Sequence, residues 1–162
     1  MNKEYEYSFK VKDIKPFIDY CIDNNYQKNK EYEQIRLLYK NGGKVMARIT
    51  KNTYEDEVVE VLNFKDDNTD DSILKISRET KDLVITDENR SFVESLLEIL
   101  DLKEVKKLVR KRYVYKKNNV LFELDNYSSP KMNVVAIEGI KDEVDVIYNE
   151  LKGVIDNNIL ED

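Results

Sequence analysis

The pattern that most constrains this chain lies at its start, where residues 4–10 alternate between polar and aromatic side chains. A period of two predicts a β-strand, with Tyr5, Tyr7 and Phe9 on the face that packs against a core. The opposite face then carries Glu4, Glu6, Ser8 and Lys10. Two carboxylates side by side are ligands that a divalent cation prefers. The alternative is an edge strand whose charged face is solvated.

The composition predicts a single globular domain over residues 1–162. A chain of 162 residues buries roughly two thirds of its unfolded surface, which is enough for one core. Charged residues are mixed with apolar ones throughout, which argues against disorder. The single cysteine excludes an intrachain disulfide, and no apolar run is long enough for a membrane span or a secretory signal. We therefore expect a cytoplasmic location and no membrane partner.

The net charge and the absence of histidine limit which partners and which metal or catalytic sites the chain can have. The net charge of −6 disfavours a nucleic-acid duplex as partner, because duplex binding depends on a dominant positive surface. Without histidine and with one cysteine, a zinc site or a histidine-based triad is all but excluded. Carboxylate oxygens and hard cations remain as the available metal chemistry. The sequence leaves the oligomeric state open, a homodimer included.

Periodicity predicts eight strands, with helices at three places. After the first strand, others are expected near residues 33–39, 44–51, 58–65, 73–79, 106–115, 120–125 and 133–138. The acidic run 66–71 is predicted to be a solvated loop, since it lacks the glycine and the distal Glu of an EF-hand calcium loop. So many strands in hairpins indicate an antiparallel α+β layout, and a closed barrel is the simplest way to remove their edges.

Each predicted helix has an apolar face. Asp13 is expected to cap the first helix, and its stripe includes Cys21, which is therefore predicted to lie in the core. Thr86 is expected to cap the second, and the third follows the last strand. The second helix is predicted to bury Phe92, Val93, Leu96, Leu97, Ile99 and Leu100, and the third Val144, Ile147, Tyr148 and Leu151.

Charged residues recur inside the predicted strands. They are Arg48, Lys65, Arg110, Arg112, Asp125 and Glu138. Each alone would be expected to face water, but a closed barrel whose strands direct a charged row inward forms a hydrated tunnel. Such an interior is costly unless something fills it. A polyanion with divalent cations fits, because Arg and Lys bind phosphate oxygens while carboxylates hold the metal.

Six segments carry motifs whose order and spacing together point to a known family. They are Glu4-Tyr5-Glu6 for an opening E-x-E-x-K, Lys44 to Arg48 for a hairpin strand, Val61 to Lys65 for L-T-x-K, Arg110 to Tyr115 for basic-x-Arg-x-x-aromatic, Leu124-Asp125 for L-D, and Val134 to Gly139 for F-x-E-x-E-G. The chain thus resembles the CYTH superfamily of triphosphate tunnel metalloenzymes. This superfamily includes thiamine triphosphatases, inorganic triphosphatases and class IV adenylyl cyclases.

The resemblance implies an eight-stranded tunnel that binds a triphosphate-containing small molecule. It assigns Mg²⁺ or Mn²⁺ to Glu4, Glu6, Asp125 and Glu138, and the phosphates to Arg48, Lys65, Arg110 and Arg112. The implied chemistry is metal-assisted phosphoryl transfer, in which basic residues fix the geometry of the triphosphate. Glu4, Glu6 and Lys10 are the catalytic candidates.

The two ends of this pattern depart from the family. Ser8 replaces the lysine of the first strand, although Lys10 lies on the same face one pleat further along. Ala136 replaces the first Glu of the final pair. Glu123, which shares a face with Asp125, either supplies the missing carboxylate or is a solvated strand residue.

Two middle strands depart as well. Where the third strand of the family carries a second Arg, this chain has Met46 or Thr50. In the fifth strand the family's R-x-E-x-E corresponds to Ser77 and Glu79, or to Arg78 if the register shifts by one residue. Such a slip reverses which side chains face the interior, so no role is assigned there.

Two classes of function follow. The first is a metal-dependent hydrolase of inorganic or organic triphosphate, because four family carboxylates are present and water can replace one lost ligand. The second is a module that binds a polyphosphate or nucleotide without turnover, because the missing lysine and glutamate belong to the catalytic pattern. We expect the hydrolase. Adenylyl cyclase is a minor third option, since nothing in the sequence indicates a pocket specific for adenine.

Overall fold

The computed structural model describes residues 2–67 and 73–160, with the side chains of all of these except residues 2–4 and Lys75. The strands in this part of the chain are β1 (Asn2–Val11), β2 (Gln27–Lys40), β3 (Val45–Thr53), β4 (Val58–Asp66), β5 (Leu74–Glu79), β6 (Leu83–Val84), β7 (Lys103–Lys117), β8 (Val120–Ser129) and β9 (Lys131–Gly139). The helices are α1 (Lys15–Asp23), α2 (Arg90–Ile99), α3 (Lys141–Glu150) and α4 (Lys152–Asn158). None of these described helices has the length and apolar character needed to cross a membrane.

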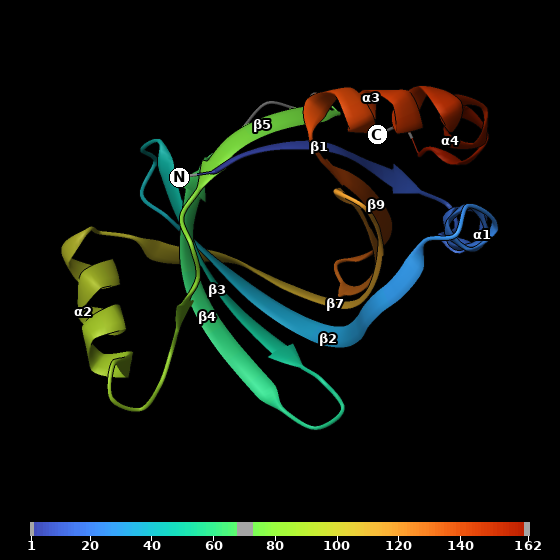
Figure 1. The fold of residues 1–162 in the computed structure, drawn as a ribbon. Helices are drawn as coiled ribbons and strands as arrows, with labels where there is room; N and C mark the ends of the chain where they lie inside the picture. Colours follow the sequence, from blue (N-terminus) through green and yellow to red (C-terminus); the bar gives the residue numbers. More distant parts are fainter. Residues whose placement is uncertain (1, 68–72, 161–162) are drawn as a thin grey trace.

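Eight of the strands form a closed antiparallel barrel (Figure 1). Neighbours pair in the order β3, β2, β7, β8, β9, β1, β5 and β4, and β4 pairs again with β3. The joint between β4 and β5 consists of one residue pair, Lys65 and Glu79. The predicted eight-stranded α+β barrel is confirmed. β6 is an additional strand that pairs with β4, and two residues are too few to show a periodicity in sequence.

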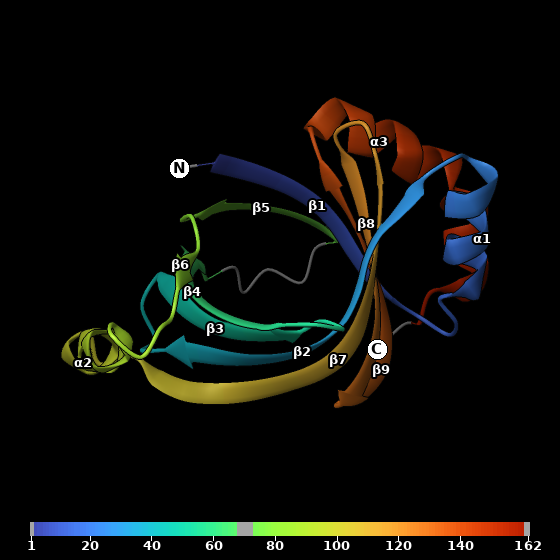
Figure 2. The same cartoon turned by 60° about the horizontal axis from the view of Figure 1, so that its bottom comes forward.

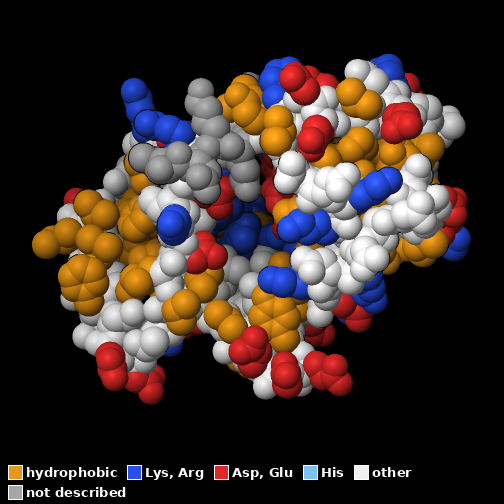
Figure 3. Space-filling model, viewed as in Figure 1, with side chains coloured by type: hydrophobic (Ala, Val, Ile, Leu, Met, Phe, Trp, Pro, Cys, Tyr) orange, Lys and Arg blue, Asp and Glu red, His pale blue; other side chains and the backbone are white. Residues whose placement is uncertain are grey.

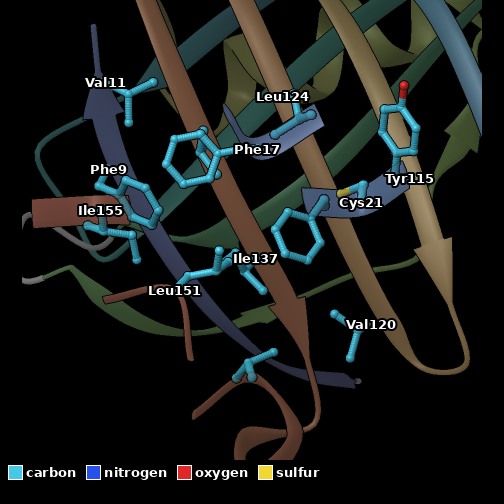
Figure 4. Close-up of a cluster of buried hydrophobic side chains, with 13 residues drawn as sticks. Phe9, Val11, Phe17, Cys21, Tyr115, Val120, Leu124, Ile137, Leu151 and Ile155 are labelled. Carbon is cyan, nitrogen blue, oxygen red and sulfur yellow. The ribbon is translucent and has the colours of Figure 1, made fainter. Parts of the chain in front are cut away.

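The larger apolar core lies outside the barrel, between its wall and three helices. α1, α3 and α4 lie together on one side of the molecule, next to β1, β8 and β9 (Figure 1 and Figure 2). Phe9 and Phe122 from the strands share this core with Phe17 and Val144 from the helices, and all four are buried. Figure 4 shows Phe9 and Phe17 within it. The core occupies this position because the alternating strands direct their apolar face outward and their polar face inward.

Two predictions for this core are confirmed. Tyr5, Tyr7 and Phe9 all pack into it, and the ring of Tyr7 stacks on that of Tyr148 with 4.1 Å between centroids. Cys21 is fully buried, and burial raises the pKa of its thiol to about 12.

α2 stands apart from the other helices, on the opposite side of the barrel, and its predicted buried face is too wide (Figure 1). It packs a smaller apolar cluster through Val93 and Leu97, whereas Phe92 and Ile99 are 64% and 81% exposed. A helix turns about 100° per residue, so Phe92 and Ile99 lie about a third of a turn away from Val93. Leu100 follows the helix and is also exposed, and Leu96 is only half-buried.

The predicted starts of the first two helices need correction. The N-cap of α1 is Ile14, one residue after Asp13, although the Asp13 carboxylate accepts a hydrogen bond from the Lys15 N–H at 2.9 Å. α2 begins only at Arg90, because Thr86 belongs to the preceding turn, where it and Asn89 bond to each other's backbone. Of the loop predicted over 66–71, residue 66 ends β4 and residues 68–71 lie outside the described residues.

Candidate functional site

The barrel encloses a cavity of about 310 Å³ with a charged wall. Most of the predicted site residues line it, namely Glu6, Arg48, Lys65, Arg110, Arg112, Asp125 and Glu138. The side chain of Glu4 lies outside the described residues, and Lys10 is exposed and does not border the cavity. Figure 3 shows the hollow at the centre of the molecule, with Lys and Arg side chains gathered inside it.

The register of β7 and β8 brings opposite charges together inside the barrel. Arg110 and Arg112 face the cavity, whereas Lys111 between them is exposed on the outer face. Arg112 lies directly across the ladder from Asp125, and side chains at such paired positions on one face are neighbours.

Asp125 is held between the two arginines and is 2% exposed. Arg112 donates from Nε to Oδ1 and from Nη2 to Oδ2, both at 2.8 Å, and Arg110 donates from Nη1 to Oδ2 at 3.1 Å. Arg110 also donates to the Gln34 amide oxygen at 2.6 Å and to the Tyr127 hydroxyl. The bidentate contact fixes the plane of the Arg112 guanidinium group, and the bonds to Asp125, Gln34 and Tyr127 together fix that of Arg110.

Arg112 has a second acidic partner, Glu123. Its Nη1 donates to Glu123 Oε2 at 2.6 Å. Burial alone would lower the pKa of Arg112, but the charges of Glu123 and Asp125 raise it well above its ordinary value. Arg112 therefore remains charged inside the barrel.

The fifth strand places Glu79 in the cavity wall and Arg78 outside. Arg48 donates to Glu79 Oε1 at 2.5 Å, and the Lys65 ammonium lies 3.8 Å from Oε2 of the same carboxylate. Arg78 forms its ion pair with Asp66 at 3.1 Å and is mostly exposed. This settles the register that the sequence left open in favour of Ser77 and Glu79 as inward residues.

Arg36 of β2 is a cavity residue that the sequence analysis missed. Its Nε donates to Thr50 Oγ1 at 3.0 Å, and no carboxylate of the described chain forms an ion pair with it. Burial, together with the charges of Arg110 and Arg48, lowers its pKa well below the ordinary value for arginine. Its alternation with Gln34 and Leu38 along β2 is the signal that would have located it.

Three carboxylates form a group at the cavity wall. Glu6, Glu123 and Glu138 each offer one oxygen, and these oxygens lie within 4.8 Å of one another. Such an all-oxygen donor set fits Mg²⁺ or Mn²⁺. The structure thus joins the predicted ligands Glu6 and Glu138 to Glu123, whereas Asp125 contacts the arginines instead.

One nitrogen in the cavity wall has no partner. Arg110 is 5% exposed, yet its Nη2 is buried without a hydrogen bond in the part of the chain that the structure describes. A buried, charged donor without an acceptor is costly, and an anion in the cavity would satisfy it.

Known proteins share this fold at low sequence identity. The sequence matches no family model and no curated protein. PH1012 from Pyrococcus horikoshii is 19% identical, with a TM-score of 0.73 over 92% of this chain and 88% of its own. HpAC1 from Hippeastrum, a candidate adenylyl cyclase described as having a dominant triphosphatase activity, is 17% identical, with a TM-score of 0.59 over 95% and 87%. A chain of the Schizosaccharomyces pombe Mediator head module is 6% identical, with a TM-score of 0.63 over 96% of both.

These likenesses show that the chain shares its barrel fold with proteins of distant sequence. They do not choose an activity, because one fold hosts both a protein described by its triphosphatase activity and a chain of a multisubunit assembly. The function has to be argued from the cavity itself.

Proposed function

We propose that this chain binds a triphosphate-containing small molecule in the barrel cavity and hydrolyses it with Mg²⁺ or Mn²⁺. The observation that carries the proposal is the convergence of basic side chains on one cavity inside the barrel, lined by Arg36, Arg48, Lys65, Arg110 and Arg112. Two of these residues are incompletely paired within the described part of the chain: Arg36 forms no ion pair, and Arg110 has a nitrogen without a hydrogen-bond acceptor. The likeness to HpAC1 supports the same class of reaction.

The residues divide the work by charge. Arg110 and Arg112, which Asp125 holds in place, would bind phosphate oxygens, and Arg36 would add a guanidinium group that has no ion-pair partner among the described residues. Glu6 and Glu138, a directly paired set on β1 and β9, would hold the cation. A bound divalent cation neutralises phosphate oxygens and promotes attack by water on the anhydride.

A binding module without turnover is the second candidate. Ser8 and Ala136, which stand where the family pattern has Lys and Glu, pair directly with each other across β1 and β9 and both line the cavity. Two missing charged groups at one point of the wall would impair catalysis more than phosphate binding. Cyclisation of ATP is a third option, because an adenylyl cyclase acts on the same triphosphate.

Arg36 offers the sharpest test of the phosphate site. We expect Arg36→Gln to weaken the binding of inorganic tripolyphosphate at least tenfold, since hydrogen bonds to charged groups contribute about 1.5–3 kcal/mol. Stability should not fall, because the substitution removes a half-buried basic group that lacks an ion pair among the described residues. The matched control is Arg78→Gln, which removes an exposed arginine outside the cavity and should leave binding unchanged. Titration calorimetry with EDTA present measures the metal-free binding.

Phosphate release then separates the candidates. The wild-type chain is incubated with tripolyphosphate and a panel of organic triphosphates, each with Mg²⁺ and with Mn²⁺. Release that requires a metal supports the hydrolase. Binding without release supports the binding module, and cyclic nucleotide formed from ATP supports the cyclase. If the chain neither binds nor hydrolyses any triphosphate, the proposal is wrong.

A further inference from the structure

Glu123 lies next to the position where the chain lacks an acidic residue. In the ladder, Ala136 of β9 pairs with Ser8 of β1 on one side and with Glu123 of β8 on the other. All three side chains line the cavity. Because Ser8 and Ala136 are small, the row leaves room for the longer side chain of Glu123 to extend over Ala136.

The next row supplies the rest of the acidic group. Glu6 and Glu138 are direct partners across β1 and β9, one pleat from Ser8 and Ala136. Glu123 reaches this pair, since one oxygen of each of the three carboxylates lies within 4.8 Å of the other two. Three carboxylate oxygens at this spacing, one from each residue, form an all-oxygen donor set that a divalent cation can bridge.

The unpartnered Arg110 nitrogen independently points to a ligand in the same cavity. Its side chain is 5% exposed and lines the wall that also carries the acidic group. Glu123 connects these two features, because Arg112, its partner at 2.6 Å, shares Asp125 with Arg110. An anion bound by the arginines and a cation bound by the carboxylates would therefore be adjacent.

We infer that Glu123 is a third carboxylate ligand of the divalent cation, supplied from β8 in place of an acidic residue at position 136. This inference rests on the proposed function. A carboxylate has two oxygens, so Glu123 can contact the cation while it holds Arg112. It also competes with phosphate for Arg112, so its removal weakens cation binding without weakening metal-free anion binding.

The first experiment measures Mn²⁺ binding to the full chain without any triphosphate, from the electron paramagnetic resonance signal of free Mn²⁺. We expect Glu123→Gln to weaken Mn²⁺ binding about tenfold or more, as expected when a charged ligand is lost. Glu138→Gln should have a similar effect. The matched control, Glu33→Gln, changes an exposed glutamate on β2 outside the cavity and should bind Mn²⁺ like the wild type. In EDTA, Glu123→Gln should bind tripolyphosphate at least as tightly as the wild type.

The second experiment moves the carboxylate across the ladder. The double variant Glu123→Ala, Ala136→Glu keeps the number of carboxylates and the side-chain volume of the row, and we expect it to recover Mn²⁺ affinity to within about threefold of wild type. Wild-type Mn²⁺ affinity in Glu123→Gln, with weakened affinity in Glu138→Gln, would overturn the inference and leave the proposed function standing. The inference is also overturned if the double variant does not recover Mn²⁺ affinity, or if the wild type does not bind Mn²⁺. Failure of the proposed function is seen separately, as absence of tripolyphosphate binding.

Discussion

The outer and inner faces of β8 are both shielded from water, but different forces hold them. On the outer face, Phe122 and Leu124 are fully buried among apolar side chains of α1 and the neighbouring strands. On the inner face, Glu123 and Asp125 meet arginines through short hydrogen bonds. Apolar contacts stabilise the fold without any ligand. Buried charges stabilise it only in so far as their partners offset the cost of desolvation, so the inner face is the one that a ligand can complete.

The largest effect is expected on the outer face, from Phe122→Ala. Phe122 is fully buried, and its ring centroid lies 5.1 Å from that of Tyr26 and 5.8 Å from that of Tyr20. Its truncation should lower the free energy of unfolding by about 3–5 kcal/mol, because it removes buried apolar surface and leaves a cavity. Urea denaturation measures the loss. Tripolyphosphate should raise the stability of this variant by the same increment as the wild type, since the inner face is intact.

Asp125→Asn breaks the inner face at its centre. The variant leaves Arg110 and Arg112 buried without the charge they share, which should lower the free energy of unfolding by about 3 kcal/mol. Unlike the loss at Phe122, this one should be largely recovered by an anion, because a bound anion supplies the negative charge that the two arginines have lost. Tripolyphosphate should therefore bind Asp125→Asn more tightly than it binds the Phe122 variant, and at one ligand concentration it should stabilise Asp125→Asn more; a ligand that binds only the folded state adds about 2.7 kcal/mol at a hundredfold excess over its dissociation constant. Thermal melts with and without tripolyphosphate in EDTA test this. An equal increment for both variants would contradict the contrast between the two faces.

The two faces also differ in how much about their residues could be predicted from the sequence alone. Strict alternation placed Tyr5 and Phe9 outside and Arg110 and Arg112 inside, because a period of two is a local property of the strand. The contacts of Glu123 depend instead on which residues of β7 and β9 lie opposite, and register is a property of pairing. Sequence reasoning therefore left Glu123 open between ligand and solvated residue.

Two further results required the folded chain. The metal-ligand role that the resemblance gave Asp125 stays a prediction, and its contact with two arginines appears only in three dimensions. The exposed positions of Phe92 and Ile99 follow from the narrow contact between α2 and the barrel, which hydrophobicity of the helix does not reveal. The local sequence pattern predicts the strands and helices and which face of each is apolar. The partners of a buried charge, and the width of the contact between a helix and the barrel, depend on how these elements pack.

The outer face should set an alkaline limit on stability through Cys21. Burial raises the pKa of its thiol to about 12, so the unfolded chain, whose thiol titrates near 8.5, loses this proton first. The protonated thiol's contribution to the free energy of unfolding is intact below about pH 8.5 and is lost as pH rises toward 12. The loss reaches about 2 kcal/mol by pH 10. Urea denaturation of the wild type and of Cys21→Ala at pH 7 and pH 10 tests it. The same slope in both would show that Cys21 is not the cause.

The smallest expected effect concerns Lys10, the lysine that the resemblance offers in place of Ser8. Lys10 follows the inward alternation of β1 but is exposed and does not border the cavity, whereas Lys65 borders it near Glu79. We expect Lys65→Ala to weaken tripolyphosphate binding about tenfold and Lys10→Ala less than about twofold, because an exposed, screened charge contributes well under 1 kcal/mol. Calorimetry on both variants at one ionic strength makes the comparison. An effect at Lys10 as large as that at Lys65 would mean that the bound state draws Lys10 into the cavity, and the inner face would then extend one pleat further along β1.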